Sequence, residues 1–144
     1  MTTESTGAES TTADLQARAA IENLVAEYAH GVDTRDADRF AAVWHTDATW
    51  HFNGKTLQGT EAFLASAAAL WETFPQMSHL FGSVSITVDG DTATGESLAY
   101  ANLVDGEGTT RMAVARYVDR YTRVDGQWRI AERTTTTSKP VTLG

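Results

Sequence analysis

The sequence predicts an α+β fold, in which helices in the first half of the chain cover an antiparallel sheet formed by the second half. Apolar residues recur at helical spacing over residues 13–32 and again after Gly59. From residue 78 onward β-branched and aromatic residues dominate, and Asp-Gly turns interrupt them. Helices that precede a run of strands are typical of a layered α+β domain, and 144 residues with 42% hydrophobic content suit one domain with one core.

The first helix is expected over residues 13–32, after a polar, acidic stretch at residues 1–12 that we expect to be a disordered tail. Its core-facing stripe, at i, i+3, i+4 and i+7 spacing, consists of Ile21, Leu24, Val25, Tyr28 and Val32. Asp33 follows on the flank of this stripe, where the chain leaves the helix. Asp33 is either the N-cap of a second helix or a group with a chemical role, and Thr34 and Asp36 are equally good caps.

The middle of the chain is expected to hold a short β-hairpin between two more helices. The second helix is expected over residues 36–45, and strands at residues 48–52 and 55–57 flank an Asn-Gly turn. The third helix begins near Gly59 and ends before Pro75. Four long strands joined by tight turns then form an antiparallel meander over residues 79–138.

Small residues line one face of two neighbouring long strands. This face consists of Ser97, Ala99, Ala101 and Leu103 on one strand and of Ala113, Ala115 and Tyr117 on the next. If the helices cover this face, the small side chains leave room for a cavity of the kind that binds small molecules. The alternative is that the alanines only let the first helix pack closely, and the pattern alone does not decide between the two.

Composition excludes several classes of partner. The formal net charge of −8, with no basic block, argues against a nucleic-acid partner. The absence of cysteine excludes a disulfide framework and Cys-ligated metal, and we expect a cytoplasmic protein. The first residues lack the basic start and apolar run of a signal peptide, and no segment has the roughly 18 apolar residues of a membrane span, so no membrane partner is expected.

The order of two helices, a hairpin, a helix and four strands resembles the nuclear-transport-factor-2-like (NTF2-like) cone fold, in particular its SnoaL-like branch. The segments that carry the resemblance are RAAIENLVAEYAHGVDTRD, DATWHFNG, MSHLFGS, ANLVDGEG and DRYTRVDGQWRIAERT. They look most like hexachlorocyclohexane dehydrochlorinases and scytalone-dehydratase-type enzymes. The resemblance implies one domain over residues 13–138, with a C-terminal tail at residues 139–144. It also implies a cone-shaped α+β barrel, in which three N-terminal helices pack on a strongly curved, mixed, mainly antiparallel sheet that encloses a pocket.

The resemblance also implies a set of catalytic residues. In those elimination enzymes an Asp at the end of the first helix pairs with a His at the start of the first long strand, and an Arg on the last strand completes a polar cluster. The matching residues here are Asp33, His79 and Arg133. Tyr28 stands where the dehydratases place a pocket tyrosine. The dehydrochlorinases carry a lysine in this region of the first helix that has no counterpart here, so the proton-abstracting pair is retained without the halide-handling lysine.

The chemistry of such a pair is proton abstraction. A neutral imidazole, with a pKa of about 6.5, accepts a proton near neutral pH, and a carboxylate on its other nitrogen fixes the tautomer and stabilises the imidazolium. His79 is therefore the expected base and Asp33 its orienting partner, while Arg133 is expected to stabilise developing charge. The residues expected to bind substrate are Tyr28, Trp44, Trp50, Ser97, Ala99, Ala113, Ala115 and Tyr117.

No cofactor or metal is expected, because the sequence has neither a Gly-rich phosphate loop nor a cluster of metal ligands. The remaining histidines have ordinary interpretations. His30 lies opposite the apolar stripe, His45 is expected at the end of the second helix, where a cation is favoured, and His51 alternates with Trp50 on the hairpin. A three-histidine metal site would require all of them to converge, and it is the less favoured hypothesis.

The sequence therefore predicts a cofactor-independent lyase of the dehydratase or dehydrohalogenase type that acts on a small, mostly apolar, cyclic molecule. An isomerase or polyketide cyclase of the same fold is the first alternative, since one fold hosts many reactions. A non-catalytic binding or dimerisation module is the second alternative, and a filled pocket with Asp33 far from His79 would favour it. Relatives of this branch are often trimers or dimers, so we expect a homo-oligomer.

Overall fold

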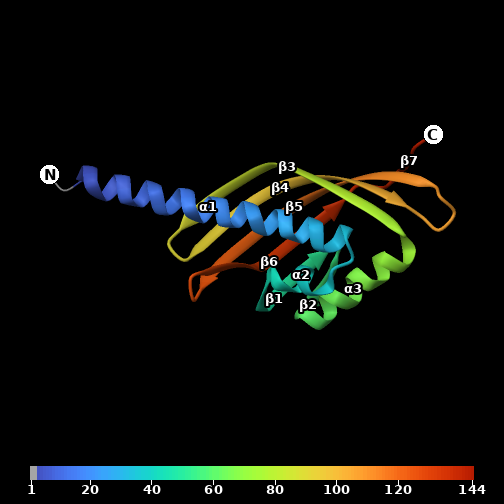
Figure 1. Cartoon of the computed structure of the whole chain (residues 1–144), viewed down its shortest axis with the longest axis horizontal. Coiled ribbons are helices and arrows are strands. Elements are labelled where there is room, and N and C mark those ends of the chain that lie inside the picture. The colour runs from blue at the N-terminus through green and yellow to red at the C-terminus, as the bar shows by residue number, and fades with distance from the viewer. Residues whose placement is uncertain (1–2) are drawn as a thin grey trace.

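The computed structural model of the chain describes residues 3–144, with side chains described from residue 12 onward (Figure 1). The first helix, α1 (Thr3–Asp33), begins earlier than the expected start near residue 13. The predicted disorder of residues 1–12 falls on residues 1–2, which lie outside the described residues, and on residues 3–12, where α1 is drawn but side chains are described only for residue 12. The disorder of residues 1–12 therefore stays a prediction. The expected core-facing stripe is confirmed, because Ile21, Val25 and Val32 are all buried.

The short helix α2 (Ala37–Ala42) follows α1 after a tight turn. Asp36 is its N-cap, and the Asp36 carboxylate accepts a hydrogen bond from the backbone N–H of Arg39 at 3.0 Å. Asp33 therefore does not cap this helix. At Gly31 an added Cβ would lie 2.7 Å from the backbone nitrogen of Phe40, so only glycine allows α1 and α2 to approach this closely.

The second helix is shorter than the residues 36–45 predicted for it. The backbone N–H of Ile130 donates to the carbonyl of Val43, and the strand β1 (Trp44–Phe52) begins at the next residue. His45 therefore lies in a strand and not at a helix C-terminus, which corrects the expected placement. The strand β2 (Lys55–Gln58) pairs with β1 across the Asn-Gly turn, as predicted.

The helix α3 (Thr60–Thr73) leads into four long strands that form the predicted meander. These strands are β3 (Gln76–Asp89), β4 (Thr92–Val104), β5 (Thr110–Val124) and β6 (Gln127–Thr137). The sheet order is β2-β1-β6-β5-β4-β3, and β1 runs parallel to β6 while the other neighbours along this order are antiparallel. The mixed, mainly antiparallel sheet is thus confirmed, although over the described residues it is open and does not close into a barrel.

The C-terminal segment contributes to the fold. Residues 139–144 are predicted as a tail, yet β7 (Val141–Thr142) pairs antiparallel with β5. The helices gather on one side of the curved sheet, where α1 runs across the long strands and α3 lies near their far end (Figure 1). The inner face of the sheet, under α1, is therefore the place where a core or a cavity forms.

Aromatic residues of the core gather where β1 meets the helices. Trp44 and Phe63 have ring centroids 4.4 Å apart, and Trp44 and Trp50 lie 5.3 Å apart. Phe40 packs on this cluster from α2. Large aromatic rings thus fill the interior at the β1 end of the inner face.

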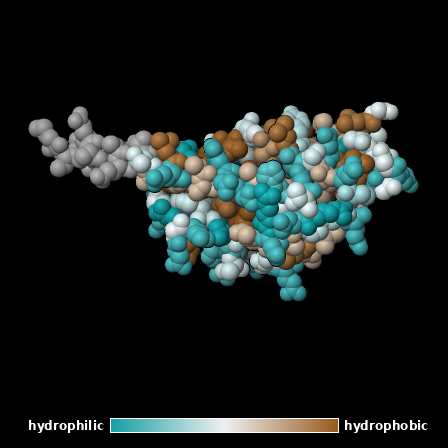
Figure 2. All heavy atoms as spheres, viewed as in Figure 1, coloured by the Kyte–Doolittle hydropathy of each residue, from teal (hydrophilic) through white to brown (hydrophobic). Residues whose placement is uncertain are grey.

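Polar and charged residues cover most of the surface shown in Figure 2, with apolar side chains scattered among them. No helix in the described part of the chain is both long enough and apolar enough to cross a membrane.

Candidate active site

Asp33 and His79 are in direct contact. Asp33 is the last residue of α1, and His79 lies near the start of β3. The Nδ1 atom of His79 lies 2.6 Å from Oδ1 of Asp33, and the backbone N–H of His79 donates to Oδ2 at 2.7 Å. Both oxygens of one carboxylate therefore hold one residue, which fixes the position of the imidazole relative to its own backbone.

The contact also sets the protonation pattern of the imidazole. A carboxylate accepts hydrogen bonds, so the neutral ring carries its proton on Nδ1 and presents Nε2 as an acceptor. The side chains of His79 and Asp33 are 12% and 18% exposed, so the pair is largely buried but keeps some contact with solvent. A neutral imidazole in this state can take a proton from a bound molecule and leave a cation beside a fixed anion.

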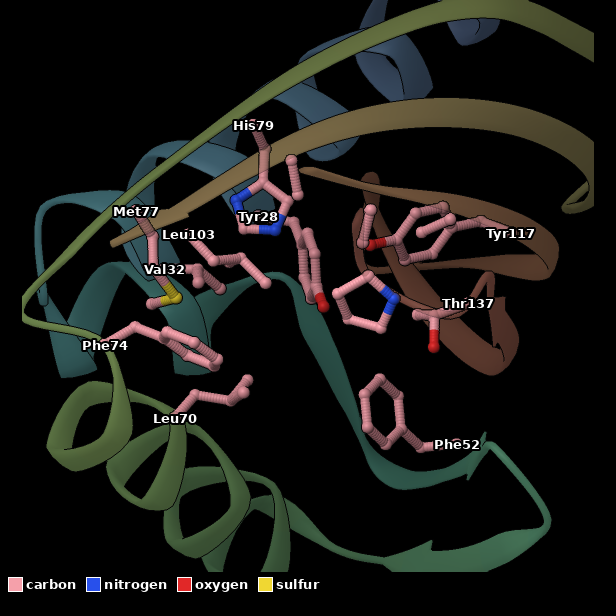
Figure 3. A pocket seen from close by; sticks show the side chains of 14 residues that line it. Tyr28, Val32, Phe52, Leu70, Phe74, Met77, His79, Leu103, Tyr117 and Thr137 are labelled. Atoms are coloured by element: carbon pink, nitrogen blue, oxygen red, sulfur yellow. The ribbon is translucent and has the colours of Figure 1, made fainter. Parts of the chain in front are cut away.

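His79 projects into a cavity of about 170 Å³ that lies between the helices and the inner face of the sheet (Figure 3). Its walls are mostly apolar and come from α1, β1, α3, the long strands and the C-terminal segment. The residues that line it are Tyr28, Val32, Phe52, Leu70, Phe74, Met77, His79, Ala101, Leu103, Ala113, Ala115, Tyr117, Thr137 and Pro140. An apolar cavity with a few convergent polar groups is typical of a small-molecule site.

Three alanines of the predicted small-residue face form one wall of the cavity. Ala101 pairs with Ala113 across β4 and β5, and Ala115 is the next inward-facing residue of β5. Ser97 and Ala99 share this face, but they are buried further along β4 and are not part of the cavity wall. The alternation of side chains along a strand predicts which face of the sheet a residue lies on. It does not predict which part of that face is covered by packed helices and which part borders a cavity.

The two tryptophans expected to bind substrate lie in the core instead. Trp44 and Trp50 are 4% and 1% exposed, and neither lines the cavity. The indole N–H of Trp50 donates to Oγ1 of Thr135 at 3.0 Å, within the core. The indole rings of Trp44 and Trp50 both pack in the aromatic cluster with Phe63, so they lie in the core next to the cavity and do not line it.

Arg133 is entirely buried and does not contact the Asp33–His79 pair. Its Nε and Nη2 atoms each donate to a different oxygen of Asp119 at 2.8 Å. The Tyr121 hydroxyl donates to the same carboxylate, also at 2.8 Å. Arg133 thus forms a buried ion pair with Asp119, and the catalytic role that the resemblance implies for it stays a prediction.

The guanidinium of Arg133 packs against two tyrosines that line the cavity. It lies 4.3 Å from the ring centroid of Tyr28 and 4.6 Å from that of Tyr117. Burial raises the pKa of Tyr28 above its ordinary value and raises the pKa of Tyr117 further, while the charge of Arg133 opposes both shifts. Both phenols are therefore neutral hydrogen-bond donors at neutral pH.

Sequence reasoning missed several residues of the site. Asp119 and Tyr121 follow Tyr117 at alternate positions of β5, so alternation alone places them on the same inner face. Leu70 and Phe74 enter the cavity wall because α3 ends over the sheet, and Pro140 enters it because β7 returns along β5. Those contacts join segments distant in sequence, and no local pattern indicates them.

The other histidines do not converge on a common point. His30 is exposed on α1, Nδ1 of His45 accepts from the backbone N–H of Asp47, and His51 contacts Thr56 and Glu132 near the edge of the sheet. Among the described residues there is no group of three or more His, Cys, Asp or Glu side chains that could hold a metal ion.

The comparisons with known proteins agree with this architecture. Residues 13–134 match the SnoaL-like domain family. The gamma-hexachlorocyclohexane dehydrochlorinase of Sphingobium indicum is 33% identical over 129 residues, which cover 86% of this chain and 82% of the relative. A crystal structure of a type 2 hexachlorocyclohexane dehydrochlorinase has a TM-score of 0.85, with 27% identity and 91% of each chain covered. The type 3 enzyme from Novosphingobium barchaimii has a TM-score of 0.84, with 26% identity over 90% of this chain and 92% of that one.

Proposed function

Because the chain belongs to the SnoaL-like domain family, we propose that it is a cofactor-independent lyase in which His79 and Asp33 remove a proton from a small cyclic substrate. One observation carries the proposal. The imidazole that projects into the apolar cavity is held by a carboxylate at 2.6 Å, which is the arrangement that a general base requires. The names of the dehydrochlorinase relatives support an elimination reaction.

The proposed step begins at Nε2 of His79. This nitrogen takes a proton from a carbon of the bound ring, and the electrons of the C–H bond form a carbon–carbon double bond as the neighbouring leaving group departs with its own electron pair. The imidazolium that results is stabilised by the Asp33 carboxylate. The reaction needs one base and donors for the departing group, and Tyr28 is the donor in the cavity wall that comes from the same helix as Asp33.

An isomerase or cyclase would use the same base, because both reactions also begin with removal of a proton from carbon. In an isomerase the proton returns to the substrate at another carbon. In a cyclase the carbanion instead forms a bond to a carbonyl carbon, and the carbonyl oxygen takes up the proton. A binding or dimerisation module is less well supported, since such a module needs neither the contact between Asp33 and His79 nor an apolar cavity beside it.

We also propose that the protein is a homo-oligomer, a dimer or a trimer, through the outer face of the sheet. Large apolar side chains are exposed there on three neighbouring strands. Leu80 pairs with Tyr100 across β3 and β4, and Val118 lies on β5, with exposures of 73%, 50% and 47%. Exposed apolar side chains gathered on one sheet face are typical of a protein interface.

The proposed activity is tested with two single-ring probes, β-hydroxycyclohexanone and gamma-hexachlorocyclohexane, by following enone formation and chloride release. We expect the wild-type protein to eliminate at least one of them and His79→Ala to lose about 10² to 10⁴ in kcat. His51→Ala, which removes an exposed histidine outside the cavity, is the matched control and should be fully active. Turnover that is unchanged in His79→Ala would refute the proposal.

A further inference from the structure

We propose that Tyr117 completes the site as the partner of Tyr28, and that this hydroxyl pair binds an oxygen atom of a single-ring substrate. The substrate class is then a cyclic β-hydroxy ketone, in which the carbonyl acidifies the neighbouring C–H bond and the departing group is a hydroxyl rather than a halide. This inference deepens the proposed function, because it concerns the same cavity and the same base.

Tyr28 and Tyr117 enter the cavity from opposite layers of the fold. Tyr28 comes from α1 and Tyr117 from β5, and their ring centroids lie 5.9 Å apart at an interplanar angle of 70°. Both line the cavity together with His79. Figure 3 shows the hydroxyl of Tyr28 directed into the cavity and the ring of Tyr117 beside it. A substrate ring bound between His79 and the two tyrosines would contact the base on one side and the phenol donors on another.

The two phenols are held by the buried ion pair behind them. The guanidinium of Arg133 lies within 4.6 Å of both ring centroids, and Asp119 fixes that guanidinium with two hydrogen bonds. Burial raises the pKa of both phenols, so both keep their protons at neutral pH and can donate to an oxygen atom in the cavity.

The donor set of the cavity favours oxygen over halide. A departing halide ion is stabilised best by a cation, yet the residues that line the cavity include neither lysine nor arginine. The guanidinium of Arg133 packs against both phenols but is not part of the cavity lining, and its Nε and Nη2 donate to Asp119. A departing hydroxyl needs a proton, which a neutral phenol supplies and a halide does not require.

The step balances with residues on both sides of the ring. The C–H bond breaks toward Nε2 of His79, its electrons form the double bond, and the C–O bond breaks with its electron pair on oxygen. That oxygen takes the proton of Tyr28 and leaves as water. The imidazolium then returns a proton to the phenolate through solvent, so neither residue is consumed.

The size of the cavity suits a substrate with one ring. Its volume of about 170 Å³ is close to that of an apolar cavity of roughly 150 Å³ that holds benzene in another protein. A six-membered ring therefore fits the site.

The test uses probes that bind without elimination: cyclohexanone, methylenecyclohexane and chlorocyclohexane, with affinities measured by ligand-observed nuclear magnetic resonance. We expect the wild-type protein to bind cyclohexanone roughly five- to tenfold more tightly than either oxygen-free ring, which is the effect of one retained hydrogen bond. Tyr28→Phe and Tyr117→Phe should each abolish this preference. Tyr100→Phe, on the exposed outer face of β4, is the matched control and should preserve it.

The outcomes separate this inference from the proposed function. His79→Ala should lose turnover but keep the preference for cyclohexanone, because the base does not bind the oxygen. Equal affinity for cyclohexanone and chlorocyclohexane in the wild-type protein would overturn the inference without reference to any variant. A preference that survives in both Tyr28→Phe and Tyr117→Phe would overturn it as well, even if His79 proves to be the base.

Discussion

Two aspartates each hold one basic side chain on the inner side of the sheet, and their surroundings give them different roles. Asp33 binds His79 at the edge of the cavity, and both side chains keep some exposure. Asp119 binds Arg133 with both side chains at 0% exposure. His79 uses one ring nitrogen for its carboxylate and lines the cavity, whereas Arg133 gives two of its donors to Asp119 and is not part of the cavity lining. A buried charge pair becomes chemically useful only when one partner keeps a group that faces the substrate.

The largest effect on stability is expected at the Arg133 pair. Arg133→Met removes the cation and leaves the Asp119 carboxylate buried without its partner, so the free energy of unfolding should fall by about 3 to 5 kcal/mol. Arg116→Met, on the exposed face of the same sheet, is the matched control and should change it by less than about 0.5 kcal/mol. Urea unfolding measures both. Equal, small changes in the two variants would show that the Asp119 pair has no structural role.

A smaller effect on stability should distinguish a residue that lines the cavity from a core residue on the face that β4 and β5 share. Ala115 lines the cavity and Ala99, its cross-strand neighbour, does not. Ala99→Phe should lower the free energy of unfolding by about 1 to 3 kcal/mol because it overpacks a filled core. Ala115→Phe should lower it less and should abolish cyclohexanone binding, since the new ring takes up the cavity. The same stability loss in both variants, with binding retained in Ala115→Phe, would mean that this wall is ordinary core.

The smallest effect of a single substitution on stability is expected at high pH. Burial raises the pKa of Tyr28, Tyr117 and Tyr121, so the folded protein keeps these protons where the unfolded chain loses them. Their contribution is complete below the ordinary tyrosine pKa of about 10 and declines as the pH rises above it. Each buried phenol should remove about 1 kcal/mol of stability per pH unit in that range. Tyr121→Phe should reduce the decline and Tyr100→Phe, at an exposed tyrosine, should not, as followed by urea unfolding at a series of pH values.

The sequence predicted the elements and faces of this fold more reliably than the depth of individual side chains. The spacing of Ile21, Val25 and Val32 fixes the buried side of α1, because a regular helix leaves no other choice. The placement of Asp33 beside His79 came from a resemblance, since no local rule joins residues from α1 and β3. Trp50 lies at a strand position whose side chain points inward, as a pocket residue would. Its ring nevertheless packs against aromatic neighbours from β1 and α3.

Arg133 shows a further limit of sequence reasoning. Its position on the last long strand places it on the inner face, but a long side chain can reach several partners there. Asp119 is the cross-strand neighbour of Arg133 in β5, and the guanidinium pairs with this carboxylate and does not line the cavity. The strand register determines which residue lies opposite Arg133, and the register cannot be read from a single sequence.

The most direct test of the central claim is a double-mutant cycle on Asp33 and His79 at the cavity edge, read as kcat and kcat/KM. His79→Ala and Asp33→Asn should each lower kcat by about 10² to 10⁴, and the double variant should be little worse than either, because the two residues act as a unit. Losses that multiply in the double variant would contradict the account.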